Sequence, residues 1–343
     1  MIEYSPHPFS VRILLGVTML RSIVNAVFLF GLLISSVASA EFISTPIRCG
    51  EGSKALHGTL LVPGHKERPP VILLISGSGP TDRDGNSAQL RGKNNSLKML
   101  AEELAIAGFA SVRFDKRGIA ESAAAAQAEQ DLRFQTYVDD VDAWIKLLLA
   151  DKRFSSVSLI GHSEGSSIAM LAAQRNTQVS VLVSIAGPAQ SASKILRQQL
   201  KNRLPPDLAH INETILASLE KGKSYPEVPA PLLALYRPSV QNYLISWFPV
   251  VPSEVIAQLT MPIALFQGDH DIQVAVAEAE ALKKAQNKAQ LFVIPGMNHI
   301  LKNVPLNDAQ QVASYSDPDL LLDQEFLRQL TAFLKAHLGV KKD

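Results

Sequence analysis

Six continuous apolar runs limit most strongly how this chain can fold. They cover residues 71–75, 110–114, 157–160, 179–185, 263–266 and 290–294. Such runs are typical of strands in a sheet that helices cover on both faces. The stretches between them have helical periodicity. Strand alternating with helix predicts an α/β protein with a mostly parallel, doubly wound sheet, whose ligand site lies at the carboxyl ends of the strands.

One long interval departs from this alternation. From residue 187 to 259 no strand is predicted, and helices are expected at residues 193–204, 207–220 and 231–248. We interpret this interval as a helical cap inserted over the site; the alternative is that its helices pack away from the site. The predicted division is a leader at 1–40, a core at 41–186 and 260–343, and the cap at 187–259.

The first forty residues have the pattern of an export signal. Arg21 precedes the apolar run 23–37, and residues 38–40 (Ala-Ser-Ala) supply the small side chains that a signal peptidase needs. We expect cleavage after Ala40, a periplasmic or secreted protein, and no stable membrane insertion afterwards. A retained anchor is the alternative, although the run is shorter than a spanning helix needs. Translation can start at Met1 or at Met19.

The composition is that of a globular protein without a strong net charge. The chain has 343 residues, of which 47% are hydrophobic and 19% charged, with a formal net charge of +1. This is a globular composition, and near neutrality gives no electrostatic reason to expect a nucleic-acid partner. Cys49 is the single cysteine, so no internal disulfide forms, and we expect an inert thiol.

A serine flanked by glycines marks a nucleophile. Residues 161–165 read Gly-His-Ser-Glu-Gly and lie between the apolar run 157–160 and a helical stretch. A strand-to-helix turn this sharp strains the backbone of Ser163 and exposes its hydroxyl at the sheet edge. Gly161 and Gly165 are then required because strand, turn and helix approach closely. The alternative is a glycine-rich turn without chemistry.

A histidine base and an acid must follow the serine in chain order. We assign the base to His299, in the loop after the last predicted strand. The acid is Asp271, which follows the strand at 263–266 and fixes the tautomer of the imidazole; Asp269 is the second choice. His7 lies in the leader, and four more histidines have no relation to a carboxyl edge: His57, His65, His210 and His337. His162 precedes the nucleophile, but the alternation of a strand points its ring away from Ser163.

Acyl transfer also requires two donors for the developing oxyanion. The backbone amide of Glu164, at the start of the helix, supplies one. The glycine-rich loop after residues 71–75 supplies the other, which we assign to the amide of Ser78, with Gly77 next.

The sequence predicts neither a metal nor a cofactor. Residues 269–271 (Asp-His-Asp) and 82–86 (Asp-Arg-Asp-Gly-Asn) are the runs most similar to a metal site. In the second run the glycine comes too early for a calcium loop, and Lys93 stands where the terminal glutamate should be.

These motifs resemble the α/β-hydrolase superfamily. Residues 75–86 (ISGSGPTDRDGN) look like the corresponding loop of bacterial carboxylesterases that are grouped with serine aminopeptidase-like hydrolases. Residues 115–122 (DKRGIAES) are similar to its Asp-x-Arg-Gly-x-Gly-x-Ser turn, with Ala120 in place of a glycine. The resemblance spans about residues 56–338 and implies a Ser163-His299-Asp271 triad with the amides of Ser78 and Glu164 as the oxyanion hole.

The predicted activity is hydrolysis of small carboxylic esters through an acyl-enzyme. A serine aminopeptidase or a thioesterase would use the same triad. A peptidase needs a carboxylate for the substrate amine, for which Glu213, Glu220 or Glu227 in the predicted cap is available. The third alternative is a catalytically silent binding protein on this fold.

Overall fold

Eight strands form one sheet in the order β1-β2-β4-β3-β5-β6-β7-β8. The computed structural model describes residues 42–64, 66–88 and 90–339, so the predicted leader and its cleavage site lie outside the described residues. The strands β3 to β8 run parallel, whereas β1 and β2 pair antiparallel at one edge. Their bounds are β1 (Phe42–Cys49), β2 (Leu56–Pro63), β3 (Val71–Ile75), β4 (Ala110–Phe114), β5 (Val157–His162), β6 (Val179–Ile185), β7 (Ile263–Gly268) and β8 (Gln290–Ile294).

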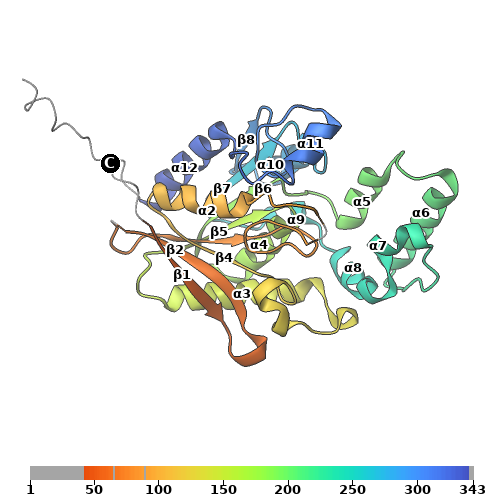
Figure 1. Cartoon of the computed structure of the whole chain (residues 1–343), viewed down its shortest axis with the longest axis horizontal. Helices are drawn as coiled ribbons and strands as arrows, with labels where there is room; N and C mark the ends of the chain where they lie inside the picture. The colour runs from red at the N-terminus through yellow and green to blue at the C-terminus, as the bar shows by residue number, and fades with distance from the viewer. Residues whose placement is uncertain (1–41, 65, 89, 340–343) are drawn as a thin grey trace, which may run out of the picture. The chain divides into compact units, whose positions relative to one another are not determined.

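Helices cover both faces of this sheet (Figure 1). Among the described residues, the helices outside the interval 187–259 are α2 (Ser96–Ile106), α3 (Phe134–Ala150), α4 (Glu164–Arg175), α10 (Val276–Ala285), α11 (Asp308–Ser314) and α12 (Gln324–Leu338). Three short 3-10 turns accompany them: η1 (Gly52–Lys54), η2 (Ala120–Ala125) and η3 (Glu129–Asp131).

Two hydrophobic cores lie on opposite faces of the sheet. Along β3, Leu73 points into the core that α3 and α4 cover, and its neighbours Ile72 and Leu74 point into the core that α2 and α12 cover. This alternation follows from the two-residue period of a strand, and it explains why a sheet covered twice shows no polar face in its sequence. The α/β prediction is confirmed, and the arrangement is an α/β-hydrolase fold.

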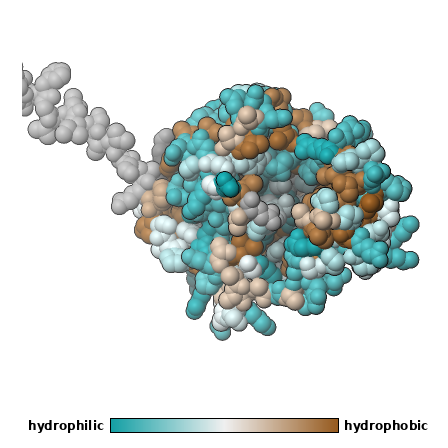
Figure 2. All heavy atoms as spheres, turned by 45° about the vertical axis from the view of Figure 1, so that its right-hand side comes forward, coloured by the Kyte–Doolittle hydropathy of each residue, from teal (hydrophilic) through white to brown (hydrophobic). Residues whose placement is uncertain are grey.

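The interval 187–259, all of which is described, holds no strand. Its elements are α5 (Ala192–Leu200), α6 (Pro206–Glu220), η4 (Ala230–Leu232), α7 (Leu233–Tyr236), η5 (Pro238–Val240), α8 (Gln241–Trp247) and α9 (Pro252–Ile256). In Figure 1, α5 to α8 stand together beside the sheet, apart from the helices on its faces. Figure 2 shows brown hydrophobic residues gathered over these helices, among teal polar ones.

The prediction of one helix over 231–248 is wrong. The chain breaks at Arg237, whose φ of −48° and ψ of 144° are extended. Pro238 is the cause, because a proline has no N–H to donate and its ring excludes helical geometry from the preceding residue. Four short elements therefore replace the expected helix.

None of the helices within the described ranges has the length and hydropathy of a membrane span.

Candidate active site

Ser163 occupies the sharp turn between β5 and α4. Its φ of 56° and ψ of −123° lie outside the conformations that a serine ordinarily adopts, so the turn holds a strained backbone. Although Ser163 is the N-cap residue of α4, its hydroxyl makes no capping hydrogen bond. The hydroxyl is therefore not used to stabilise the helix.

The glycines beside Ser163 allow the close approach of three elements. A Cβ at position 161 would lie 2.3 Å from the carbonyl oxygen of Gly165, and a Cβ at position 165 would lie 2.3 Å from that of Ile75. Neither distance is sterically possible, so strand β5, helix α4 and the end of β3 could not pack in this way with any other residue at Gly161 or Gly165.

His299 and Asp271 meet at the carboxyl end of the sheet. His299 lies in the loop after β8 with 5% of its surface exposed, and its Nδ1 donates to Oδ2 of Asp271 at 2.8 Å. Because Nδ1 carries the proton in this hydrogen bond, Nε2 of the neutral ring is left as an acceptor. This is the protonation state that a general base requires.

The carboxylate of Asp271 is held in place from several sides. It accepts the N–H groups of Gln273 at 2.7 Å and Val274 at 2.9 Å, and the amide of Gln267 at 3.1 Å. Burial favours the neutral acid, but the charge and hydrogen bond of His299, together with the backbone donors, lower the pKa of Asp271 below its usual value. The carboxylate is therefore ionised at neutral pH.

Asp269, the second choice for the acid, has a different role. Its Oδ1 accepts the N–H of Gly296 at 2.7 Å, and its side chain is 43% exposed. It caps the turn that follows β8 and makes no hydrogen bond with His299 within the described residues. Of the two aspartates, the structure pairs only Asp271 with the imidazole.

A cavity of about 460 Å³ contains Ser163. Ser78 and Glu164, whose amides are the predicted oxyanion donors, line the same cavity. Part of its wall comes from the helices between β6 and β7. Its apolar lining residues there are Ala192, Ile195, Leu196, Ala234, Leu235, Val240, Tyr243, Leu244 and Trp247.

His162 belongs to the site, contrary to the sequence analysis. Its Nε2 donates to the backbone carbonyl of His299 at 2.7 Å, and the two rings lie 4.8 Å apart between centroids. Burial, and then the neighbouring His299, lower the pKa of His162 to about 4, so its ring stays neutral. Its position next to Ser163 is visible in the sequence, but its contact with His299 depends on the loop after β8, which the local sequence does not place.

The sequence analysis also missed Lys116 and the side-chain contact of Glu164, whose amide it had assigned to the oxyanion hole. Lys116 is 3% exposed and its Nζ donates to the carbonyl oxygen of Gly77 at 2.6 Å. The carboxylate of Glu164 accepts the hydroxyl of Tyr243 at 2.6 Å. Lys116 lies inside the run 115–122, but the sequence does not indicate that its side chain turns inward.

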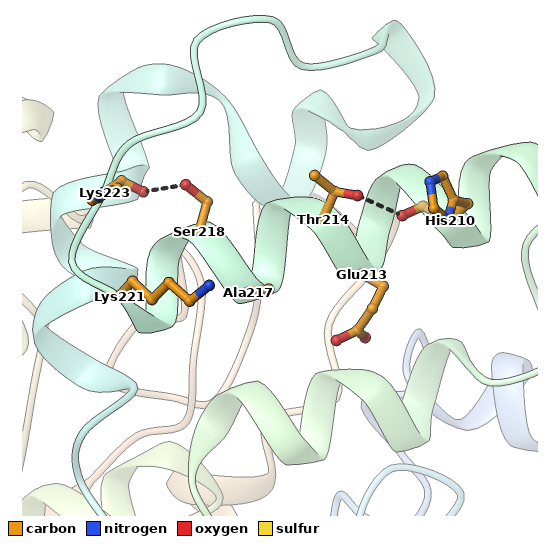
Figure 3. Close-up of a pocket in the computed structure, with 7 residues that line it drawn as sticks. All are labelled: His210, Glu213, Thr214, Ala217, Ser218, Lys221 and Lys223. Carbon is orange, nitrogen blue, oxygen red and sulfur yellow. Dashed lines mark hydrogen bonds between the residues drawn. The ribbon is translucent and has the colours of Figure 1, made fainter.

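A second hollow lies along α6 and the turn that follows it (Figure 3). Thr214 and Ser218 donate to the carbonyl oxygens of His210 and Lys223, so their hydroxyls are already used. Glu213 also lines it, and its carboxylate pairs with Arg197. None of the predicted catalytic residues lines this hollow.

The runs that resembled metal sites are occupied by protein contacts. Oδ1 of Asp82 accepts the N–H groups of Asp84 and Asn86, and Asp84 pairs with Arg113. No group of three or more metal-binding side chains occurs within the described ranges.

Cys49 is buried, and burial, with the charge of Asp140, raises the pKa of its thiol to about 11.

A mostly parallel sheet, a strained serine after β5 and a His-Asp pair at the same edge define the class of α/β-hydrolases. The family described as "Serine aminopeptidase, S33" matches residues 93–229, a range that includes Ser163 and ends before Asp271 and His299.

Known proteins extend this similarity. Esterase EstD of Thermotoga maritima is 28% identical over 249 residues, which are 72% of this chain and 58% of EstD. The chain thus spans less than two thirds of this relative. Est1E of Butyrivibrio proteoclasticus with bound ferulic acid superposes with a TM-score of 0.58 at 17% identity, over 85% of this chain and 99% of Est1E. Esterase Pf2001 of Pyrococcus furiosus superposes with a TM-score of 0.57 at 16% identity, over 87% of this chain and 92% of the esterase. The expected resemblance is confirmed.

Proposed function

We propose that this protein is a serine hydrolase that cleaves carboxylic esters through an acyl-enzyme. The observation that carries the proposal is the His299–Asp271 hydrogen bond of 2.8 Å at the sheet edge where Ser163 stands, half-buried, on a strained turn. His162 links the Ser163 turn to the His299–Asp271 pair, because it is adjacent to Ser163 in the chain and donates to the carbonyl of His299. The similarity to EstD supports the same activity.

In the first step, Nε2 of His299 removes the hydroxyl proton of Ser163 and Oγ bonds to the ester carbonyl carbon. The amides of Ser78 and Glu164 donate to the oxyanion that forms. The imidazolium, stabilised by Asp271, then gives its proton to the leaving alcohol. In the second step, water repeats the attack on the acyl-enzyme and releases the acid.

The cavity favours compact or medium-sized apolar acyl groups. A volume of about 460 Å³ is within the range of sites for small organic ligands. Trp247, Leu235 and Ile195 are among the apolar side chains that the helical cap contributes to its wall. Residues 187–259 thus act as the cap of the site.

An aminopeptidase is a weaker reading because, among the described residues that line the cavity, each carboxylate already has a partner. Glu213 and Glu220, two of the three candidates, both pair with Arg197, and neither they nor Glu227 line the cavity. The lining carboxylates are Glu129 and Glu164.

Both lining carboxylates already have partners. Glu129 binds Arg237 and Ser239, and Glu164 accepts from Tyr243. A thioesterase would need no such carboxylate, and comparing oxygen and thiol esters of one acyl group separates it from an esterase.

Export is part of the proposal and is supported by the leader sequence alone. The mature protein starts at Glu41 and acts in the periplasm or outside the cell. Amino-terminal sequencing of the protein from a periplasmic fraction tests this step. A chain that retains Arg21 in that fraction would overturn the cleavage site.

The activity is tested with p-nitrophenyl acetate and the variant Ser163→Ala. We expect the wild type to turn over this ester, and the variant to lose the activity while keeping the circular dichroism spectrum and melting temperature of the wild type. Hydrolysis at the wild-type rate by a folded Ser163→Ala would refute the proposal.

A further inference from the structure

Lys116 is a buried lysine that the ester-cleaving steps above do not use. It follows β4 by two residues, and β4 lies beside β3 in the sheet. The loops after these two strands therefore meet at one edge, which brings Nζ of Lys116 to 2.6 Å from the carbonyl oxygen of Gly77. The preceding residue, Asp115, is anchored by the N–H and guanidinium of Arg83. The loop that carries Lys116 is thus firmly positioned.

The acceptor of this hydrogen bond belongs to the peptide group that matters for the oxyanion. The carbonyl of Gly77 and the N–H of Ser78 are the two ends of one planar, trans peptide, so they point in opposite directions. With the carbonyl fixed on Lys116, the N–H is directed away from it. No acceptor for the Ser78 N–H occurs among the described residues.

This peptide lies against the serine turn. A Cβ on Gly77 would come within 3.1 Å of the Cβ of Ser163, and Ser78 lines the cavity together with Ser163. An ammonium donor makes a stronger hydrogen bond than a neutral one and polarises the peptide, which makes the N–H at its other end a better donor. Both effects favour an oxyanion over a neutral carbonyl oxygen.

The surroundings of Lys116 direct its charge to this peptide. The bond to Gly77 is its single hydrogen bond within the described part of the chain, and it forms no ion pair there. Its Nζ lies 5.2 Å from the ring centroid of Tyr137, a distance that suits a cation–π contact. The carboxylate of Glu164 contributes an attractive charge without direct contact, which opposes the lowering of the Lys116 pKa by burial.

We propose that Lys116 is a positioning residue of the oxyanion hole, whose ammonium holds and polarises the Gly77–Ser78 peptide so that the Ser78 amide stabilises the transition state. This role rests on the proposed esterase function. It differs from substrate binding, because the interaction strengthens only when charge develops on the carbonyl oxygen.

Lys116→Met removes the charge and the donor with little change in volume. We expect kcat for p-nitrophenyl acetate to fall about 10- to 100-fold, with KM changed less than about twofold. This decrease in kcat is no larger than the decrease that removal of a complete oxyanion-hole donor causes. The affinity for a trifluoromethyl ketone, which forms an oxyanion adduct with the serine, falls by a similar factor. Lys116→Arg keeps the charge and recovers part of the loss.

Lys283→Met is the matched control. Its ammonium also donates to backbone carbonyls, those of Asn287 at 2.7 Å and Ala289 at 2.8 Å, at the far end of α10 from the cavity. We expect it to keep the wild-type kcat and the wild-type affinity for the ketone, even where its melting temperature falls. A loss of kcat in Lys283→Met equal to that in Lys116→Met would overturn the role of Lys116, because lysine removal in general would then explain the effect.

The remaining outcomes separate the two proposals. A folded Lys116→Met with wild-type kcat and ketone affinity overturns the role of Lys116 and leaves the esterase proposal intact. A raised KM at constant kcat also overturns it, since Lys116 then binds substrate. Where Lys116→Met does not fold, Lys116→Gln, a neutral donor, is subject to the same criteria. A wild type without ester hydrolysis overturns both proposals.

Discussion

The hydroxyl of Tyr243 in α8 donates to the carboxylate of Glu164, the residue after Ser163, at 2.6 Å. Both side chains are buried, with exposures of 7% and 4%. Burial and the negative charge of Glu164 raise the pKa of Tyr243 well above its usual value, so the phenol remains a donor. The helices between β6 and β7 are thereby tied to the first turn of α4, from which one oxyanion amide comes.

Replacing Tyr243 by phenylalanine tests this link. The variant leaves a buried carboxylate without its donor, so we expect a loss of about 1.5–3 kcal/mol in the free energy of unfolding. Because Glu164 carries the amide assigned to the oxyanion, kcat/KM for p-nitrophenyl acetate should fall about tenfold. Urea unfolding and steady-state kinetics measure the two effects.

Tyr236→Phe is the control for that variant. Tyr236 is buried in the same helical segment and donates to Asn212 at 2.7 Å, so its loss removes a bond to a neutral amide. We expect a loss of about 1 kcal/mol in stability and an unchanged kcat/KM. Equal kinetic losses in the two variants would show that the link to Glu164 has no special role.

The acid of the proposed triad is tested by the same substitution at two positions of one loop. Asp271→Asn removes the charge that fixes the tautomer of His299, and we expect kcat/KM to fall about 10³- to 10⁴-fold. Asp269→Asn keeps an acceptor for the Gly296 N–H and should stay within about threefold of the wild type. The reverse order of effects would transfer the role to Asp269.

The fold could be predicted from the sequence because strands buried on both faces leave continuous apolar runs. Residues 71–75, 110–114, 179–185 and 290–294 coincide with β3, β4, β6 and β8. The runs at 157–160 and 263–266 stop two residues before the strands do, because β5 and β7 end in residues that the apolar pattern does not mark, His162 and Gly268. Pairing at a strand end depends on the neighbouring strand, not on hydropathy.

Site residues that follow a strand end were within reach of sequence analysis, and residues that act through a neighbouring loop were not. Ser163 stands directly after β5, and Asp271 lies in the short loop three residues after β7, where chain order and turn geometry give a signal. The contacts of Lys116 with Gly77 and of His162 with His299 depend on how loops from different strands cross at the sheet edge. Nothing in the local sequence encodes that crossing.

Acid should destabilise the protein through His162. The folded protein holds its ring neutral with a pKa of about 4, whereas the unfolded chain takes up a proton below about pH 6.5. The unfolded state then binds more protons, so the contribution to stability is complete above that pH and is lost as the pH falls. As the pH falls from about 6.5 to 4.5, the protonation of this group should lower the free energy of unfolding by about 2 kcal/mol.

His162→Gln keeps an N–H donor for the carbonyl of His299 and does not titrate. Urea unfolding at several pH values should therefore show a smaller decrease in stability for the variant than for the wild type over this range. Parallel decreases in the two proteins would mean that His162 is protonated as easily in the folded protein as in the unfolded chain.

The central claim is that Ser163 is an activated nucleophile, and covalent labelling tests it most directly. A fluorophosphonate probe reacts with a serine hydroxyl that a histidine base and an oxyanion hole activate together. After labelling and proteolysis, mass spectrometry should find one adduct per chain, on the peptide that contains Ser163, and none in His299→Ala. An unlabelled wild type, or an adduct on another residue, would contradict the account.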